Sequence, residues 1–369
     1  MPESSAEQFS KLLNRLLTMS IDAKFNRRNN NMDALRYVMA FSVIVAHFNE
    51  LCGFHISWPI SSATGVGGFF ALSGFLIYRS YNHSPNLRTF LAKRALRILP
   101  PYFLVVLLCA FCLAGVSTLP PAEYFFSAGW LKYVGANLCF LNFLQPDLPG
   151  VFHDGRFVTS AVNGALWTMK VEWCLYLTVP VVAWICSRRH FKRSHTIVFS
   201  LIIVGSVIYS LLFIWLFATT SKEIYAMLAR QFFGQLSFFY IGALAALKLE
   251  QWLKHKWLWL ALLLTGIALM QINDYVEIAL WPFVAGGLVI WTSMVGSWGK
   301  YFSQHDNVSY DMYLFHFPIL QLCVYFGVPS LGCAACFIIA LAATVLLSAL
   351  SWHTVGKRAQ SLKYKLTKC

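Results

Sequence analysis

The sequence has 369 residues, of which 58% are hydrophobic and 12% are charged, and its mean hydropathy is +0.60. A soluble globular domain is about half apolar and about a quarter charged, so this composition excludes an ordinary soluble protein and predicts several membrane spans. The formal net charge of +14 would suit a nucleic-acid binder, but basic residues of a polytopic membrane protein also gather on its cytoplasmic loops.

Ten apolar stretches are long enough to be membrane-spanning helices. They are residues 34–52, 66–82, 98–117, 166–187, 196–219, 231–248, 257–272, 277–297, 308–327 and 332–355. With the N-terminus placed in the cytoplasm, 24 of the 29 Lys and Arg residues fall on the inner side. The sequence therefore predicts an all-α polytopic bundle of about ten transmembrane helices with both termini cytoplasmic, and it argues against nucleic acid as a partner.

The flanking segments divide the chain into three parts. Residues 1–31 carry an apolar stripe at helical spacing flanked by basic residues, which predicts an amphipathic helix on the inner leaflet, although a partly ordered tail fits equally. Residues 32–356 form the transmembrane domain, and residues 357–369 form a basic cytoplasmic tail.

Ionisable residues inside spans are costly and mark function by default. Arg36 and His47 are eleven residues apart, so they share one face of the first helix about 16 Å apart. Glu172 lies about 9 Å and His47 about 8 Å below the outer edge of their spans, so we expect the carboxylate to meet and orient the imidazole. The structural alternatives are an Arg36 that only snorkels, a hydrogen-bonded core His47, and a Glu172 paired with Lys170.

The ninth span adds further polar groups. Tyr310 and Tyr313 lie within one helical turn, and Asp311 and His316 lie well inside the apolar stretch. Pro318 leaves the carbonyl four residues earlier without its helical partner and permits a kink beside His316. Polar groups from three spans at these depths predict a cavity, which suits either an enzyme or a transporter.

The inner loop between the second and third spans is basic. Arg94 and Arg97 are neighbours on a helical face and suit phosphate, although contact with lipid head groups explains them as well. Before this loop, the small residues of 65–74 are typical of close helix packing. The CxxC pairs at 109–112 and 333–336 lie on apolar helices without a further ligand set, so we expect no metal.

Together these motifs resemble the acyltransferase-3 family of integral membrane O-acyltransferases, which is mostly bacterial. The resemblance runs from Asp33 to about Trp352, and its most specific element is Arg36-x10-His47. Four further motifs follow in the family's order: FFALSGFLI (69–77), FLAKRALRILPPY (90–102), LWTMKVEWCLY (166–176) and SYDMYLFHFPI (309–319).

The resemblance implies transfer of an acyl group, most often acetyl, from cytoplasmic acetyl-CoA to a hydroxyl of a glycan or a lipid-linked saccharide. The protein would lie among the lipids of a bacterial inner membrane. His47 would be the catalytic base or transient acyl carrier, with Glu172 and Arg36 beside it, and Arg94 and Arg97 would bind the CoA phosphates. The residues that would line the cavity or stabilise the oxyanion are Tyr310, Tyr313, His316, Ser73 and Asp33.

Two positions depart from the family pattern. Gly67-Gly68 replaces a polar-plus-apolar pair, and Gly356-Lys357-Arg358 stands where the family has an acidic-basic-proline signature. Other function classes also fit the intramembrane histidines and carboxylates: a proton-coupled transporter could use them as a relay. In a non-catalytic scaffold, apolar substitutes for His47 and Glu172 would increase stability.

Overall fold

The computed structural model describes residues 30–187 and 195–365, and every secondary-structure element in these ranges is helical. The predicted amphipathic stripe at the N-terminus lies outside the described residues. Ten helices of 14 or more residues follow the ten predicted spans: α2 (Met32–Cys52), α3 (Ser62–Asn82), α4 (Leu87–Cys112), α7 (Trp167–Ser187), α8 (His195–Thr220), α10 (Phe232–Leu247), α12 (Lys256–Leu269), α13 (Asp274–Met294), α15 (Ser309–Tyr325) and α16 (Cys333–Ser351).

Short elements accompany these long helices. They are α5 (Pro121–Phe126), α6 (Ala128–Leu138), α9 (Glu223–Ala229), α11 (Leu249–Lys254), α14 (Lys300–Gln304) and α17 (Lys357–Lys365), with 3-10 turns η1 (Leu113–Val116), η2 (Asn142–Leu144) and η3 (Val328–Leu331) and the π-helical segment η4 (Trp352–Gly356). Part of the predicted basic tail is thus the helix α17, which packs against α4.

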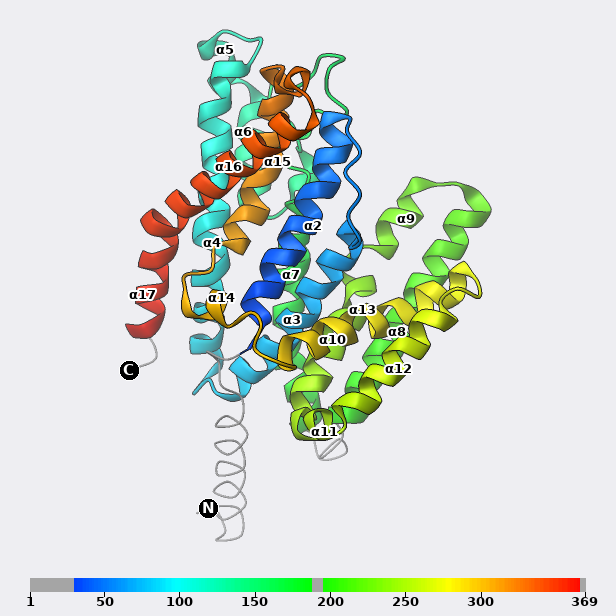
Figure 1. The fold of residues 1–369 in the computed structure, drawn as a ribbon. Helices are drawn as coiled ribbons and strands as arrows, with labels where there is room; N and C mark the ends of the chain where they lie inside the picture. The colour runs from blue at the N-terminus through cyan, green and yellow to red at the C-terminus, as the bar shows by residue number, and fades with distance from the viewer. Residues whose placement is uncertain (1–29, 188–194, 366–369) are drawn as a thin grey trace.

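Five helical stretches in the described ranges are long and apolar enough to cross a membrane: Leu87–Val116, Trp167–Ser187, His195–Thr220, Asp274–Met294 and Cys333–Leu362. The other predicted spans are shorter or more polar, so the number ten stays a prediction. The start of α2 and the end of α17 lie toward the same end of the bundle (Figure 1). An even number of spans would give this arrangement.

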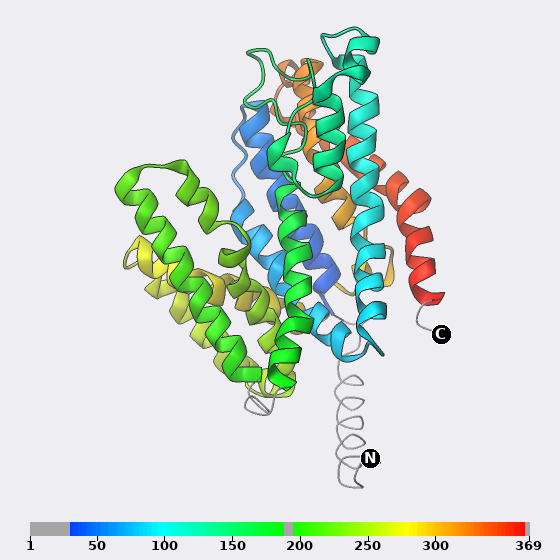
Figure 2. The same ribbon diagram turned by 180° about the vertical axis from the view of Figure 1, so that it is seen from behind.

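The long helices pack in a continuous series. α15 lies between α16 and α2, α2 packs on α3, and α3 packs on α10, which also contacts α8 and α13 (Figure 1). Seen from behind, α7 lies between α4 and α8 (Figure 2). The first and ninth predicted spans are therefore neighbours. The motif that begins at Arg36 on α2 consequently lies beside the motif that begins at Ser309 on α15.

Glycine allows the closest of these contacts. A Cβ on Gly74 of α3 would lie 1.8 Å from the carbonyl oxygen of Phe239, and one on Gly242 of α10 would lie 1.9 Å from that of Ala71. The two backbones therefore touch, and any larger residue would force α3 and α10 apart. This confirms the prediction that the small residues of 65–74 serve helix packing.

Residues 118–165, which the predicted topology places on the outer side and which we call the outer segment, fold back onto the bundle. The Tyr124 hydroxyl donates to the carbonyl of Ala110 on α4 at 2.9 Å, and the Gln321 amide on α15 donates to Thr159 O and Ala161 O at 2.8 and 2.9 Å. Its residues Leu148, Val151 and Val162 are fully buried. Helix α7 consequently begins beneath a layer of protein.

Candidate active site

A cavity of about 490 Å³ opens among α2, α3, α4, α7 and α15. Eight of the ten predicted site residues line it: Asp33, Arg36, Ser73, Arg94, Arg97, Glu172, Tyr310 and Tyr313. We call it the arginine cavity, after the three arginines. The remaining two, His47 and His316, are not among its lining residues.

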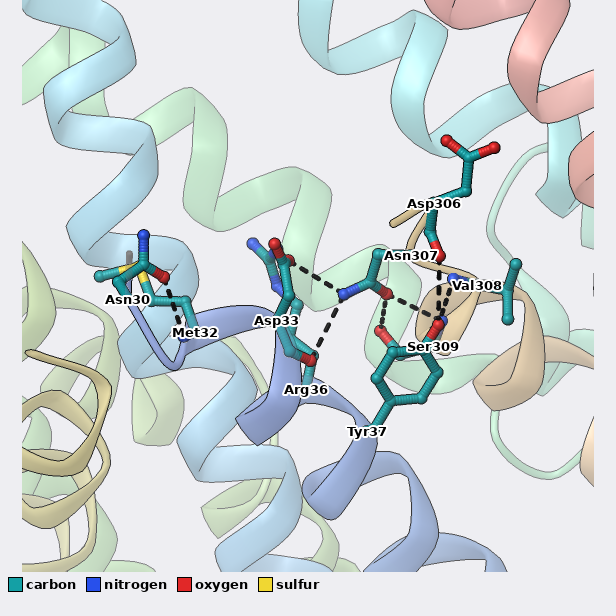
Figure 3. A network of polar contacts seen from close by, with 9 residues as sticks. All are labelled: Asn30, Met32, Asp33, Arg36, Tyr37, Asp306, Asn307, Val308 and Ser309. Carbon is teal, nitrogen blue, oxygen red and sulfur yellow. Dashed lines mark hydrogen bonds and ion pairs between the residues drawn. The ribbon is translucent and has the colours of Figure 1, made fainter. Parts of the chain in front are cut away.

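Arg36 is held at the wall of this cavity by an acid from its own helix. Its Nη1 lies 2.7 Å from Asp33 Oδ1, which also accepts from Asn307 Nδ2 at 2.9 Å (Figure 3). Asn307 Oδ1 in turn accepts the backbone N–H of Ser309 at 2.9 Å. The network joins the start of α2 to the start of α15. It holds the Arg36 side chain through an ion pair with Asp33, a partner that an arginine which only snorkels would not need.

Asn307 was not among the predicted site residues, although it lines the cavity and completes this network. Its position two residues before α15 is typical of a side chain that satisfies backbone groups at a helix start. A local sequence signal therefore existed, but it indicated a cap rather than a contact with the first helix.

Arg94 and Arg97 enter the cavity from the first turns of α4. Arg94 is 7% exposed, and its Nη2 donates to Ser80 Oγ at 3.3 Å. Ile98 follows Arg97, and its carbonyl accepts a hydrogen bond from the Tyr310 hydroxyl at 3.1 Å. A guanidinium of this kind offers five N–H donors in a planar fork, which suits bidentate binding of phosphate.

Glu172 lies in the arginine cavity and not beside His47. Its carboxylate accepts from Ser73 Oγ at 3.3 Å and from the hydroxyl of Tyr176. The expectation that Glu172 orients His47 is therefore wrong. Glu172 is paired with hydroxyl groups, and His47 is paired with another ring.

The error comes from the reference used for depth. Thr168 near the start of α7 donates to the Tyr313 hydroxyl at 2.9 Å, so these two residues lie at one level. His316 is three residues outward from that level on α15 and Glu172 is four residues inward on α7, which separates them by about 10 Å along the bundle. The apolar stretch of α7 starts beneath the outer segment, so counting from its edge placed Glu172 too near the outer surface.

His47 is paired with His316 across α2 and α15; we call these two residues the histidine pair. His47 Nδ1 lies 2.8 Å from His316 Nε2, and the rings are nearly parallel, at 15°. His316 Nδ1 lies 2.8 Å from the carbonyl oxygen of Tyr313. His316 is fully buried whereas His47 is partly exposed. With both ring nitrogens engaged, His316 has no N–H to offer an oxyanion, so that predicted role does not fit the geometry.

Pro318 shapes the outer side of the histidine pair. Proline lacks the N–H that would bond the carbonyl of Leu314, and this carbonyl accepts the side-chain amide of Asn163 at 2.8 Å instead. The prediction that Pro318 frees this carbonyl is confirmed. The freed carbonyl attaches the outer segment to α15 two residues before His316.

Tyr313 separates the arginine cavity from the histidine pair. Its ring makes edge contacts with Phe69, which lines the cavity, and with His316, both at 5.8 Å between ring centroids. The hydroxyl group is engaged with Thr168. Tyr313 therefore lies between the arginine cavity and His316, the partner of His47.

The acidic residue of α15 is satisfied separately. Asp311 is 2% exposed and accepts from the Ser351 hydroxyl at 2.5 Å. In the described ranges, no group of three or more His, Cys, Asp or Glu side chains is placed to hold a metal ion.

The chain matches the acyltransferase-3 family model, described as an acyltransferase domain, over residues 29–353. It is 27% identical to nodulation protein 10 of Rhizobium leguminosarum bv. viciae over 373 residues, covering 91% of this chain and 95% of that protein. It is 24% identical to the O-acetyl transferase of Shigella phage Sf6 over 345 residues, covering 90% and 96%. No solved structure matches the chain. A family match over most of the chain, with an all-helical fold and five candidate membrane-spanning helices in the part that the structure describes, shows that this protein belongs to the acyltransferase-3 family of membrane acyltransferases.

Proposed function

We propose that this membrane O-acyltransferase takes an acetyl group from cytoplasmic acetyl-CoA and transfers it to a hydroxyl of a glycan or a lipid-linked saccharide, in a bacterial inner membrane. The observation that carries the proposal is the convergence of eight predicted site residues on one cavity, whose inner wall bears three arginines and whose far end adjoins the histidine pair. The printed name of the phage relative, O-acetyl transferase, supports acetyl as the group transferred.

The arginine cavity is the proposed donor site. Arg94 and Arg97 line it three residues apart on α4, and we assign them to the CoA phosphates. Phosphate recognition by a guanidinium fork gives both charge and geometry. The excess of basic residues on the predicted inner side orients this end of the cavity toward the cytoplasm, where acyl-CoA is made.

His47 is the proposed catalytic base. It removes the proton of the acceptor hydroxyl as the oxygen attacks the thioester carbonyl; the new C–O bond forms, the C–S bond breaks, and the CoA sulfur takes the proton from His47. In the alternative order, His47 is acylated first and the acceptor then attacks the acyl-histidine. Rapid mixing with labelled acetyl-CoA and no acceptor separates the two, because only the second order labels the protein.

Transfer requires the Tyr313 side chain to move. With the thioester held in the arginine cavity as proposed, the Tyr313 ring stands between it and His316, the partner of His47, so we propose that a step in which Tyr313 leaves Thr168 precedes the chemistry. Closure of the ring between turnovers would limit hydrolysis of the donor.

The decisive experiment incubates purified protein with radiolabelled acetyl-CoA and candidate acceptors, both free glycans and lipid-linked saccharides. We expect acceptor-dependent label in the product, formed at least about a hundredfold more slowly by His47→Ala. The proposal fails if the wild-type protein transfers no label to any hydroxyl acceptor. Substrate uptake by proteoliposomes without acyl-CoA would instead support the proton-coupled transporter.

A further inference from the structure

The contacts of His316 determine where its proton lies. A backbone carbonyl oxygen can only accept a hydrogen bond, and that of Tyr313 lies 2.8 Å from His316 Nδ1. Two lone pairs facing each other at this distance would repel. Nδ1 of His316 therefore carries a hydrogen and donates it to Tyr313.

A second proton on His316 would place a positive charge in a costly position. The ring is fully buried, and its polar contacts in the described part of the chain are His47 and two backbone carbonyls, with no carboxylate. A buried charge without an opposite charge is strongly disfavoured. The ring is therefore neutral, and its Nε2 presents a lone pair to His47.

The same reasoning then determines which nitrogen of His47 carries its hydrogen. His47 Nδ1 lies 2.8 Å from His316 Nε2, which carries that lone pair, so Nδ1 of His47 must be the donor. A general base must be neutral before it takes a proton, and a neutral imidazole holds one hydrogen, which leaves Nε2 of His47 unprotonated in that form. Across the described residues, no hydrogen bond occupies this second nitrogen.

We propose that His316 is a positioning residue that holds His47 in the Nδ1–H tautomer, so that Nε2 of His47 is the atom that receives the proton or the acyl group. This inference rests on the proposed function for its kinetic consequence, but the tautomer itself can be measured without any substrate. A neutral imidazole thus does at this site what a carboxylate partner does for other catalytic histidines, fixing tautomer and ring orientation without adding a charge to the apolar interior.

Two amide substitutions test the positioning role. A glutamine amide reaches the position of an imidazole Nε2, whereas an asparagine amide reaches only that of Nδ1. His316→Gln can accept from His47 Nδ1, but His316→Asn can engage only the Tyr313 carbonyl. We expect His316→Asn to lower kcat by about 10²- to 10⁴-fold and His316→Gln to restore at least about a tenth of the wild-type kcat, with KM for acetyl-CoA unchanged in both.

The second measurement reads the proton directly. Solid-state NMR of protein labelled with ring-¹⁵N histidine distinguishes protonated from unprotonated nitrogens, and the His47 signals are those lost in His47→Gln. We expect a protonated Nδ1 and an unprotonated Nε2 in the wild-type protein, with the opposite tautomer appearing in His316→Asn.

The inference is overturned if wild-type His47 carries its hydrogen on Nε2, or if the asparagine and glutamine variants have the same kcat. Absence of acyl transfer by the wild-type protein would reject the proposed function and leave the NMR result to decide the tautomer. Protein that elutes as a single species with an unchanged melting temperature in detergent ensures that the kinetic comparison reports on position and not on folding.

Discussion

The arginine cavity and the histidine pair differ in almost every physical respect, although one tyrosine separates them. The cavity is roomy, lies among five helices and is lined by charged side chains that suit a large anion. The histidine pair is compact and His316 is fully buried. The two rings share a hydrogen bond, and His47 packs against the edge of the Phe317 ring.

This difference indicates that donor binding and proton transfer depend on separate sets of residues. Charge near the reacting atom would change the basicity of His47, whereas charge far from it can bind phosphate without that effect. Substitutions in the two regions should therefore affect different kinetic parameters, and each of the following variants either strengthens or breaks this division.

The largest effect is expected at His47. Removal of a general base typically costs about 10²- to 10⁴-fold, so His47→Ala should reduce kcat by that amount while acetyl-CoA binding, measured by titration calorimetry, is retained. Near-normal turnover by the purified variant would remove His47 from the chemistry. A loss of acetyl-CoA binding would show that the two regions are not separate.

Removal of Arg94 or Arg97 comes next. A hydrogen bond to a charged group is worth about 1.5–3 kcal/mol, so Arg94→Ala and Arg97→Ala should each weaken CoA binding by about ten- to a hundredfold. Their effect should diminish at high salt, since it is electrostatic. Lys132→Ala, in the outer segment, is the matched removal of one positive charge. Unchanged affinity in both arginine variants would leave them only a topological or lipid-contacting role.

Glu172→Gln tests the corrected position of the carboxylate. Because Glu172 contacts Ser73 and Tyr176 inside the arginine cavity, we expect KM for acetyl-CoA to change while kcat falls less than about tenfold. If kcat instead falls as far as it does in His47→Ala with KM constant, Glu172 does act through His47, and the static separation of the two groups is not the catalytic arrangement.

The smallest effect is expected where the two regions meet. Thr168→Val and Tyr313→Phe both remove the hydroxyl contact that joins α7 to α15, and a single neutral hydrogen bond is worth about 0.5–1.5 kcal/mol. Both variants should change kcat in the same direction by about two- to tenfold, and Thr168→Ser should not. A hundredfold loss confined to Tyr313→Phe would assign its hydroxyl to the oxyanion.

Much of the site could be predicted because its residues stand out from their surroundings. Arg36, Arg94 and Glu172 are charged groups in or beside apolar helices, so each is conspicuous in the sequence. Asn307 is not conspicuous in this way, since a polar residue before a helix is ordinary. Its contact with Asp33 depends on α2 and α15 being neighbours, although more than 270 residues separate the two in the chain.

The sequence by itself determined the helical class, the position of each long helix along the chain and the residue types available for chemistry, since apolar length and intramembrane charge are local properties. The pairing of His47 was decided only by tertiary structure. Depth along a span does not specify which helix lies beside it. Because α7 starts beneath the outer segment, Glu172 lies deeper in the bundle than the histidine pair. The neighbour of His47 is therefore a second imidazole, on helix α15, which is also attached to that segment by the hydrogen bond from the Asn163 amide to the Leu314 carbonyl.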